Sequence, residues 1–330
     1  MNNSIVFCGN IIIDQVKMIS RWPDKGMLVP ISSVKRAVGG SVSNTAIDLK
    51  TLDPSVDVKA LGKVGADDNG DFVVRFLEEK GVDCSQVSKI AERPTSFTDV
   101  MTVEGTGERT FFNLHGADSA LVPEDVDVAK LDCGIFHFGY LLLLDGMDAP
   151  DAEYGTKAAR LLARVQAAGV KTSVDIVSEQ SDRFARIVRP ALKYCDYCVI
   201  NEVEGALATG RRPDDLKGVC EGLFDLGVRE RVVVHCPEVG VTMGRDGGFV
   251  RVGSLKLPSG WIKGTVGAGD AFCAGTLYSL LKGFDPEKTL RLASCAAAMN
   301  LTVPDSVSGA KSFDETFALD ARFDRLTPKA

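Results

Sequence analysis

Short apolar runs alternate along the chain with longer segments whose apolar residues recur at helical spacing. This alternation is typical of a parallel sheet covered by helices. Six runs are predicted to be strands of that sheet: Ile5–Gly9, Val58–Val64, Ile135–Phe138, Thr172–Ile176, Tyr197–Ile200 and Val232–His235. Helices are predicted at Ser43–Leu52, Gly70–Lys80, Ala152–Ala168, Gly269–Lys282 and Pro286–Leu301. Gly81 and Gly169 directly follow two of these segments, as glycine follows many helices.

Two stretches interrupt the alternation and predict a second, smaller sheet. Met27–Val38 carries β-type residues between the first strand and the first helix. Ser96–Val103 and Arg109–Leu114 flank a glycine-containing turn, which is the pattern of a β-hairpin. We expect these segments to pair as a β-lid over the carboxyl ends of the parallel strands, where open α/β sheets bind ligands.

No internal repeat, low-complexity segment or long linker divides the 330 residues. We therefore expect one α/β domain over residues 1–330, with helices flanking the parallel sheet. The β-lid would be inserted in this domain at approximately residues 15–38 and 95–115.

Composition narrows the class of protein. Hydrophobic residues make up 45% of the chain and charged residues 25%, the balance of a globular protein with an ordinary core. Lys and Arg number 38 against 45 Asp and Glu, and the net charge of −7 disfavours a nucleic acid or an anionic membrane as partner. The apolar runs are strand-sized, far below the ~18 residues of a membrane span. Because Met1–Ser4 lacks a basic leader, we expect a cytoplasmic protein.

The nine cysteines are odd in number and scattered, so we expect reduced thiols rather than a disulfide framework. Cys195 and Cys198 have the spacing of a redox pair or of half a zinc site. A zinc site needs two further ligands, and the sequence has only three histidines. We therefore favour buried structural thiols for this pair.

The segment Gly264–Phe272 carries the strongest chemical signal. Its small residues let the backbone turn sharply before a predicted helix, so several N–H groups and the positive helix end face one anion. Asp270 beside them would repel a resident anion, but it fits as the base that takes a proton from a hydroxyl attacking a phosphoryl group. The structural alternative is a glycine-rich turn in which Asp270 only caps the helix.

A second group of polar residues follows the first strand and a later glycine pair. The strand delivers Asp14 to the sheet edge, Gly39 and Gly40 let another backbone approach, and Asn44 lies at a helix start. Carboxylate and amide groups hydrogen-bond paired hydroxyls, which suits a polyhydroxylated ligand. An ordinary turn followed by a helix-start residue explains the same pattern.

The third signal is Asn201–Glu204, which follows the strand predicted at Tyr197–Ile200. Oxygen ligands at the carboxyl end of a strand could hold Mg²⁺ directly or through its waters. On this segment alone the better interpretation is a polar helix start in which Glu204 interacts with the helix dipole.

Together these segments resemble the ribokinase-like (PfkB) carbohydrate kinase family over nearly the whole chain. The shared features are the N-terminal strand with Asp14, the lid insertions, GGxxxN at Gly39–Asn44, NxxE at Asn201–Glu204 and GAGDAF at Gly267–Phe272. The resemblance implies a ribokinase-like α/β fold: a central, mostly parallel sheet flanked by helices, with a small inserted β-lid that often mediates dimerisation.

The resemblance also implies a role for each matched residue in a phosphoryl transfer that uses ATP and Mg²⁺. The catalytic base would be Asp270. The remaining roles would be a backbone anion hole (Gly267, Ala268, Gly269), substrate contacts (Asp14, Gly39, Gly40, Asn44), nucleotide contacts (Asn201, Gly240, Thr265) and Mg²⁺ ligands, directly or through water (Glu204, Asn201).

Three departures from the family pattern bear on these roles. Gly264 stands where many members have an aspartate that helps to hold a monovalent cation, which weakens the case for potassium activation. The nucleotide-side segment His235–Gly240 keeps only the last glycine of the family's T-x-G-x-x-G. Ser41 replaces the lysine of ribokinases and phosphosugar kinases, which disfavours a phosphorylated sugar.

We therefore expect an ATP-dependent kinase that phosphorylates a primary hydroxyl of a free sugar or sugar-like alcohol. A nucleoside kinase is the alternative within the fold, and Phe97, Phe111 and Phe112 would then form a platform for the base. A non-catalytic sugar sensor is disfavoured because Asp270 and the loop glycines are intact. A dinucleotide-dependent oxidoreductase is weaker still, because the first strand is not followed by G-x-G-x-x-G.

The β-lid is expected to close over the sugar and exclude water. Arg109 or Asn113 would then point into the site, although a position facing solvent fits the pattern equally well. Unpaired lid edges favour pairing across a two-fold axis, so we expect a homodimer through the lid.

Overall fold

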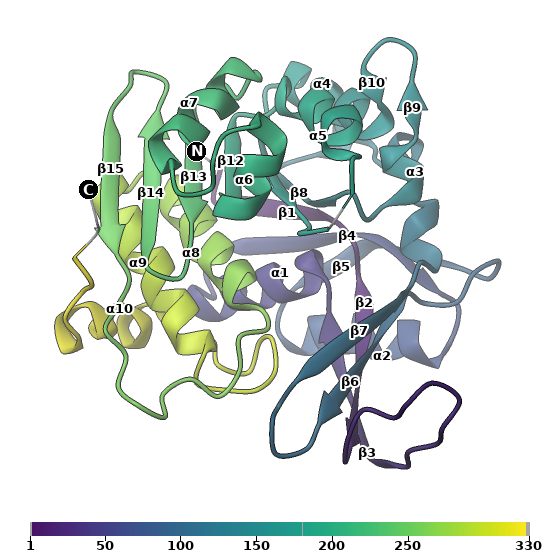
Figure 1. Cartoon of the computed structure of the whole chain (residues 1–330). Coiled ribbons are helices and arrows are strands. Elements are labelled where there is room, and N and C mark those ends of the chain that lie inside the picture. The colour runs from purple at the N-terminus through teal and green to yellow at the C-terminus, as the bar shows by residue number, and fades with distance from the viewer. Residues whose placement is uncertain (1, 180, 328–330) are drawn as a thin grey trace.

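A nine-stranded sheet runs through the middle of the molecule (Figure 1). The computed structural model describes residues 2–179 and 181–327. The strands of the sheet are β1 (Ser4–Gly9), β4 (Asp57–Gly65), β5 (Asp83–Ile90), β8 (Ile135–Leu141), β11 (Lys171–Ile176), β12 (Tyr197–Asn201), β13 (Arg231–His235), β14 (Val239–Gly244) and β15 (Phe249–Gly253). Their order is β15-β14-β13-β12-β11-β8-β1-β4-β5.

The pairings from β5 through to β13 are parallel, and β14 and β15 extend the sheet by antiparallel pairings. Every residue of β1 is buried, and alternate side chains contribute to opposite cores. Val6 and Cys8 face one core, whereas Ile5 and Phe7 face the other. A strand buried on both faces must be apolar throughout, which is why β1 is a continuous apolar run in the sequence.

Helices cover both faces of the sheet (Figure 1). One face carries α1 (Ser41–Leu52), α2 (Asp68–Glu79), α8 (Ala268–Lys282), α9 (Pro286–Asn300) and, packed on α9, α10 (Phe313–Arg322). The other carries α4 (Lys157–Ala167), α5 (Phe184–Leu192), α6 (Glu202–Thr209) and α7 (Leu216–Asp225). The connections contain the short helix α3 (Asp145–Asp148) and the 3₁₀ turns η1 (Ala117–Ala120), η2 (Pro123–Asp125) and η3 (Val128–Lys130).

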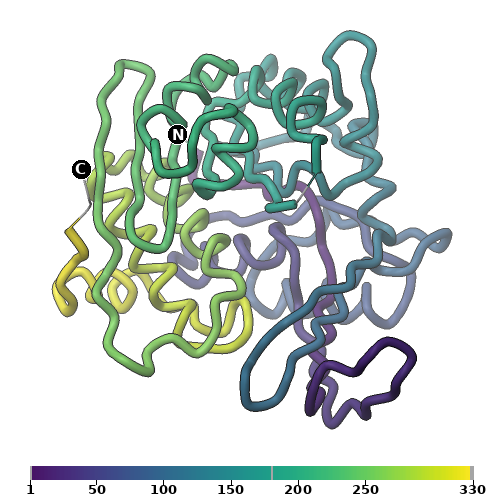
Figure 2. Tube along the Cα trace, in the orientation of Figure 1, coloured from purple at the N-terminus to yellow at the C-terminus, as the bar shows by residue number. Residues whose placement is uncertain are grey.

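A second, four-stranded sheet lies beside the central one, at the lower right of Figures 1 and 2. Its strands are β2 (Ile12–Ile19), β3 (Ile31–Gly39), β6 (Phe97–Val103) and β7 (Arg109–Leu114), in the order β3-β2-β6-β7. We call it the small sheet. Two antiparallel pairs, β2–β3 and β6–β7, are joined by a parallel pairing of β2 with β6. Because β2 follows β1 almost directly, the chain enters the small sheet from the carboxyl end of β1.

The predicted fold class, a central and mostly parallel sheet flanked by helices with a small inserted sheet, is confirmed. The predicted helix at Ala152–Ala168 is wrong in its first five residues. Gly155–Thr156, within these five residues, form the short strand β10, which pairs with β9 (Pro150–Asp151) just before them. Helix α4 begins only at Lys157 because Thr156 Oγ1 accepts the Ala159 N–H at 3.1 Å and caps it.

The nine cysteines are free thiols, and both members of the Cys195–Cys198 pair are buried. Cys195 Sγ donates to the carbonyl of Tyr197 at 2.7 Å, which is the contact of a structural thiol. Among the helices that the structure describes, none has both the length and the apolar composition to cross a membrane.

Candidate active site

Asp270 lies in the first turn of α8 and is buried. Both carboxylate oxygens accept a hydrogen bond: Oδ2 from Asn44 Nδ2 of α1 at 2.9 Å, and Oδ1 from the Tyr140 hydroxyl of β8 at 2.5 Å. Burial raises the pKa of Asp270 to about 6, although the two hydrogen bonds act in the opposite direction. A carboxylate with this pKa is ionised at neutral pH and is basic enough to take a proton from a hydroxyl.

The start of α8 forms a backbone cradle for an anion. Gly267, the residue before the helix, has a φ of +79°, and a Cβ there would lie 2.4 Å from the carbonyl oxygen of Ser306. Only glycine fits this position. Among the described residues no side chain caps this helix end. The positive helix end at Ala268 and Gly269 is therefore free to face an anion.

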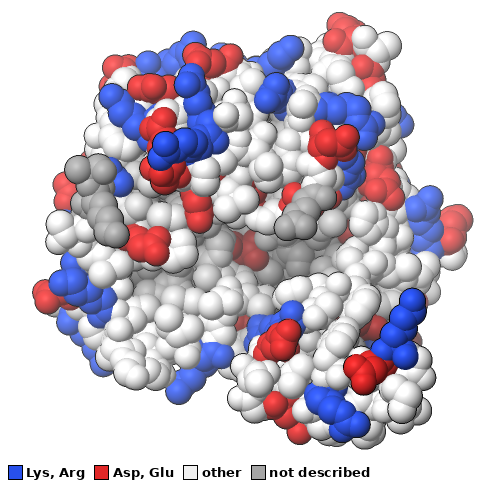
Figure 3. All heavy atoms as spheres, viewed as in Figure 1, with Lys and Arg blue, Asp and Glu red and all other residues white. Residues whose placement is uncertain are grey.

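A pocket of about 750 Å³ opens next to this cradle. Figure 3 shows the hollowed face of the molecule, with an acidic group at its floor. The walls are mainly apolar, and polar or charged side chains come from Asn201, Glu202, His235, Ser254, Lys256, Thr265 and Ser294. The lining includes Asn201, His235, Cys236, Pro237, Ile262, Thr265, Ala268, Gly269 and Ala298.

The four predicted substrate residues are absent from the lining of this pocket in the described part of the chain, and one of them, Asn44, contacts Asp270 directly. Asp14 of β2 is half-buried, and burial, followed by the charge of Asp270, raises its pKa to about 7. A Cβ at Gly39 would lie 2.5 Å from Asp14 Oδ2, so only glycine leaves room for this carboxylate. Gly40, with a φ of +88°, precedes α1, and a Cβ there would lie 2.7 Å from the Asn10 carbonyl oxygen. The glycine pair is thus required by close packing and by backbone conformation.

Two polar residues of this network were not recognised in the sequence. Tyr140 donates to Asp270, and Ser306 Oγ donates to Asn44 Oδ1 at 3.0 Å. Because Ser306 fixes the amide oxygen, the Asn44 amide nitrogen is directed at Asp270. A tyrosine at the end of an apolar strand and a serine in a C-terminal loop carry no local signal for either contact.

Asn201 and Glu204 close the start of α6 by reciprocal hydrogen bonds. Asn201 Oδ1 accepts the Glu204 N–H, and Glu204 Oε2 accepts the Asn201 N–H, each at 2.9 Å. Glu204 Oε1 also accepts from Ser178 Oγ at 2.6 Å and from Asn201 Nδ2 at 2.8 Å. Burial raises the pKa of Glu204 to about 7. This geometry is that of the polar helix start, the interpretation that the segment alone favoured.

The donor set at α6 fits a hard divalent cation, because its groups are carboxylate and amide oxygens. Both oxygens of Glu204 already accept hydrogen bonds within the protein. The arrangement therefore fits Mg²⁺ held through its waters better than direct coordination by Glu204.

Three further residues singled out in the sequence make other contacts. Gly240 of β14 is buried, a Cβ there would contact Phe272 and Leu290, and it is absent from the lining of the pocket in the described part of the chain. Arg109 donates to the carbonyl of Pro304 at 3.3 Å. Asn113 donates to Thr98 Oγ1 within the small sheet at 2.9 Å.

The model of the pfkB family carbohydrate kinases matches residues 2–312, nearly the whole chain. The chain belongs to this family. The predicted family and the predicted reaction class, a phosphotransferase with an alcohol group as acceptor, are confirmed.

Individual relatives of this PfkB protein are distant. An ATP-dependent ribose-1-phosphate kinase of Halopiger xanaduensis is 29% identical over 299 residues, which cover 89% of this chain and 90% of the relative. Arabidopsis thaliana ribokinase, solved with ribose and ATP, superposes with a TM-score of 0.79 at 21% identity and covers 97% of this chain and 99% of its own. A nucleoside kinase of Methanocaldococcus jannaschii superposes with a TM-score of 0.77 at 18% identity, covering 98% and 99%. The two structures share the fold.

Proposed function

We propose that this PfkB protein transfers the γ-phosphoryl group of ATP to a primary hydroxyl of a free sugar or sugar-like alcohol. One observation carries the proposal: the buried Asp270 carboxylate lies in the first turn of α8, at the uncapped helix start, and is hydrogen-bonded to Asn44, one of the predicted sugar-binding residues. A base in that position reaches a hydroxyl on one side, while the phosphoryl group it attacks lies against the helix end on the other.

In this scheme the acceptor hydroxyl donates to Asp270, which takes its proton as the oxygen attacks phosphorus. The backbone N–H groups at Gly267–Gly269 stabilise the charge that develops on the transferred group. Asp14, Gly39, Gly40 and Asn44 position the sugar. Mg²⁺, held through water near Glu204 and Asn201, would neutralise the phosphate charge of the bound nucleotide.

ATP is assigned to the pocket beside α8. Its apolar walls suit a nucleobase, its polar end meets the anion cradle, and Asn201 and Thr265 line it. Gly240 lies outside this lining, so we assign it no nucleotide contact; His235, Cys236 and Pro237 occupy the place expected for its segment.

A free sugar is favoured over a nucleoside or a phosphosugar. Two phenylalanines of the platform predicted for a nucleobase already have other contacts. Phe97 packs against the core, and Phe112 stacks on Trp22 with ring centroids 6.3 Å apart. Three basic side chains of the small sheet already have partners: Lys17 with Asp99, Lys35 with Asp305, and Arg109 with the carbonyl of Pro304. The Asp14 carboxyl, in its ionised form, also repels an anionic substituent.

The test is a coupled assay of ADP release with ATP and Mg²⁺ against free sugars, aldonic-acid sugars, ribose 1-phosphate and nucleosides. We expect turnover with a free sugar or sugar alcohol, and none with Asp270→Asn. Preferred turnover of a nucleoside or of ribose 1-phosphate would overturn the substrate class. Ligand binding with no turnover of any compound would identify the sensor instead.

We further propose that the small sheet closes over the sugar and forms a homodimer. Its outer strands β3 and β7 have a free edge in the described part of the chain. Large apolar side chains are exposed on these strands and their connections: Trp22, Met27, Leu28, Ile31, Val34, Phe111 and Phe112. Such a patch marks an interface. Sedimentation should give a dimer and Val34→Asp a monomer; a wild-type monomer at every concentration would contradict this.

A further inference from the structure

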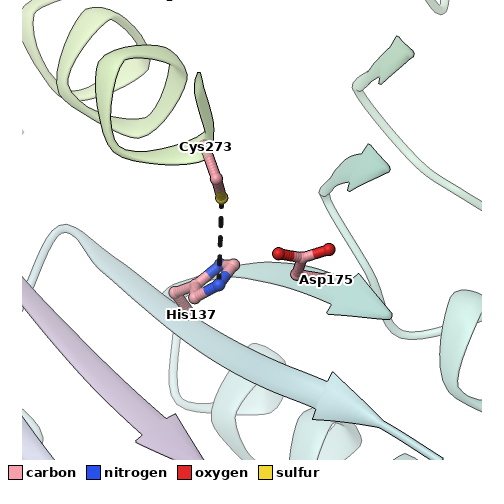
Figure 4. A group of neighbouring side chains, drawn as sticks. All are labelled: His137, Asp175 and Cys273. Carbon is pink, nitrogen blue, oxygen red and sulfur yellow. Dashed lines mark hydrogen bonds between the residues drawn. The ribbon is translucent and has the colours of Figure 1, made fainter. Parts of the chain in front are cut away.

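Three buried side chains with metal-binding groups meet between the central sheet and α8 (Figure 4). They are His137 of β8, Asp175 of β11 and Cys273 of α8. One ligand atom of each lies within 4.8 Å of the other two. None of them has a role in the phosphoryl transfer proposed above. Because each comes from a different packed element, their spacing is set by the fold rather than by a loop.

The histidine is oriented as a metal ligand. Ser173 lies opposite His137 in the parallel pairing of β8 and β11, and its Oγ is 3.1 Å from His137 Nδ1. When Nδ1–H donates to that hydroxyl, Nε2 carries the lone pair. Nε2 lies 4.0 Å from Cys273 Sγ. This separation is shorter than a Zn–S and a Zn–N bond added together, roughly 4.3 Å, so one ion fits between the two atoms.

The electrostatic surroundings favour a cation. Asp175 Oδ1 accepts the Ile176 N–H at 2.7 Å, which leaves the second oxygen for another partner. Burial, followed by the charges of Glu204 and Asp270, raises the pKa of Asp175, and no basic side chain of the described residues counters them. Burial lowers the pKa of His137 to about 3, so its lone pair is available at neutral pH. Buried carboxylates of this kind are stabilised by pairing or by a metal.

We propose that His137, Asp175 and Cys273 bind one thiophilic divalent ion such as Zn²⁺. Nitrogen, sulfur and oxygen ligands together select such an ion, whereas Mg²⁺ takes oxygen ligands. Three protein ligands leave the fourth position of a tetrahedral ion to water. Binding forms a metal–sulfur bond and releases to solvent the thiol proton of Cys273 and any proton that the Asp175 carboxyl holds. The site is independent of the proposed kinase reaction, so either proposal can fail alone.

Co²⁺ is the probe, because thiolate ligation to Co²⁺ produces strong near-ultraviolet absorption. Metal-free full-length protein, titrated without nucleotide, should develop this band and saturate at one equivalent. Zn²⁺ should abolish the band, and excess Mg²⁺ should leave it unchanged. Cys273→Ser should remove it, whereas Cys198→Ser, which changes a buried thiol on β12, should retain it.

Ser173→Ala provides a graded test, because it removes only the partner of His137 Nδ1. Loss of such an outer partner should weaken Co²⁺ binding about 10–100-fold while circular dichroism stays unchanged. If Cys273→Ser does not fold, Asp175→Asn replaces it and should likewise weaken binding. Absence of the band in folded wild-type protein, or an undiminished band in folded Cys273→Ser or Asp175→Asn, would overturn the site.

Discussion

The two sides of Asp270 are built differently. On the acceptor side, side chains are hydrogen-bonded to one another in a chain from Ser306 through Asn44 to Asp270 and Tyr140. On the donor side, a pocket of about 750 Å³ is bounded by apolar walls and by the backbone at the start of α8. In the proposed reaction, side-chain identity would therefore determine the base and the acceptor, whereas shape and backbone would determine the nucleotide.

This contrast predicts how substitutions divide. Changes on the acceptor side should alter kcat and its pH dependence, because they act on the base itself. Changes around the donor pocket should alter the apparent affinity for ATP or Mg²⁺ and leave the base unaffected.

Asp270→Asn should have the largest effect, a loss of about 10²–10⁴-fold in kcat, because the amide cannot act as a general base. Nucleotide affinity should be unchanged or tighter, since a negative charge beside the anion cradle is removed. Folding should persist. The pKa of Asp270 is raised to about 6 in the folded protein, so its ionisation lowers the stability of the fold as the pH rises through that value. The amide of the variant does not ionise and therefore does not carry this cost.

The measurement is single-turnover phosphoryl transfer together with nucleotide binding by calorimetry. Turnover of the folded variant within a few-fold of wild type would remove the assigned role. A loss of nucleotide affinity as large as the loss in kcat would contradict the proposal that Asp270 acts on catalysis and not on nucleotide binding.

The sequence singled out Asp270 but not the residues that surround it, and the reason is physical. Asp270 belongs to a local segment whose small residues carry the signal, whereas Ser306 reaches Asn44 across 262 positions of chain. Tyr140 looks like a core aromatic at the end of an apolar strand. The strands β14 and β15 were not predicted either, because an antiparallel extension of a parallel sheet has no signature in the βα alternation.

The nucleotide contact of Gly240 stays a prediction, although the lining of the pocket among the described residues does not include this glycine. The family pattern suggested a nucleotide contact, but β14 places this glycine beneath Phe272 and Leu290, where its lack of a side chain serves packing. A family pattern that survives in one residue can report packing rather than binding.

Tyr140→Phe should have the next largest effect, a shift in the pH dependence. The Tyr140 hydroxyl bond lowers the pKa of Asp270, so its removal should raise that pKa from about 6. Asp270 would then stay protonated to higher pH, and the acidic limb of kcat/KM should move to higher pH. The loss in kcat at the new optimum should be small.

Tyr278→Phe is the matched control, because Tyr278 lies on the same helix, two turns beyond Asp270. It should leave the pH profile in place. An unshifted acidic limb in Tyr140→Phe, measured over several pH values, would mean that the hydroxyl does not act on the base.

Glu204→Gln should have a smaller effect, confined to the donor side. The amide still accepts one hydrogen bond but loses the charge that attracts a hydrated cation, so the Mg²⁺ concentration for half-maximal activity should rise severalfold. Sugar KM should be nearly unchanged. Titration of Mg²⁺ at saturating sugar checks this; loss of sugar binding with an unaltered Mg²⁺ optimum would assign Glu204 to the acceptor side.

Exchange of potassium for tetramethylammonium should have the smallest effect, with kcat unchanged at constant ionic strength. Gly264 offers no carboxylate to a monovalent cation, and the buried Asn300 amide donates to the carbonyl of Val266 at 2.8 Å, directly behind the anion cradle. A protein donor thus already occupies one backbone carbonyl of this loop. Activation of the wild-type protein by potassium would contradict this prediction. Activation by potassium in Asn300→Ala alone would show that the Asn300 amide replaces a bound cation.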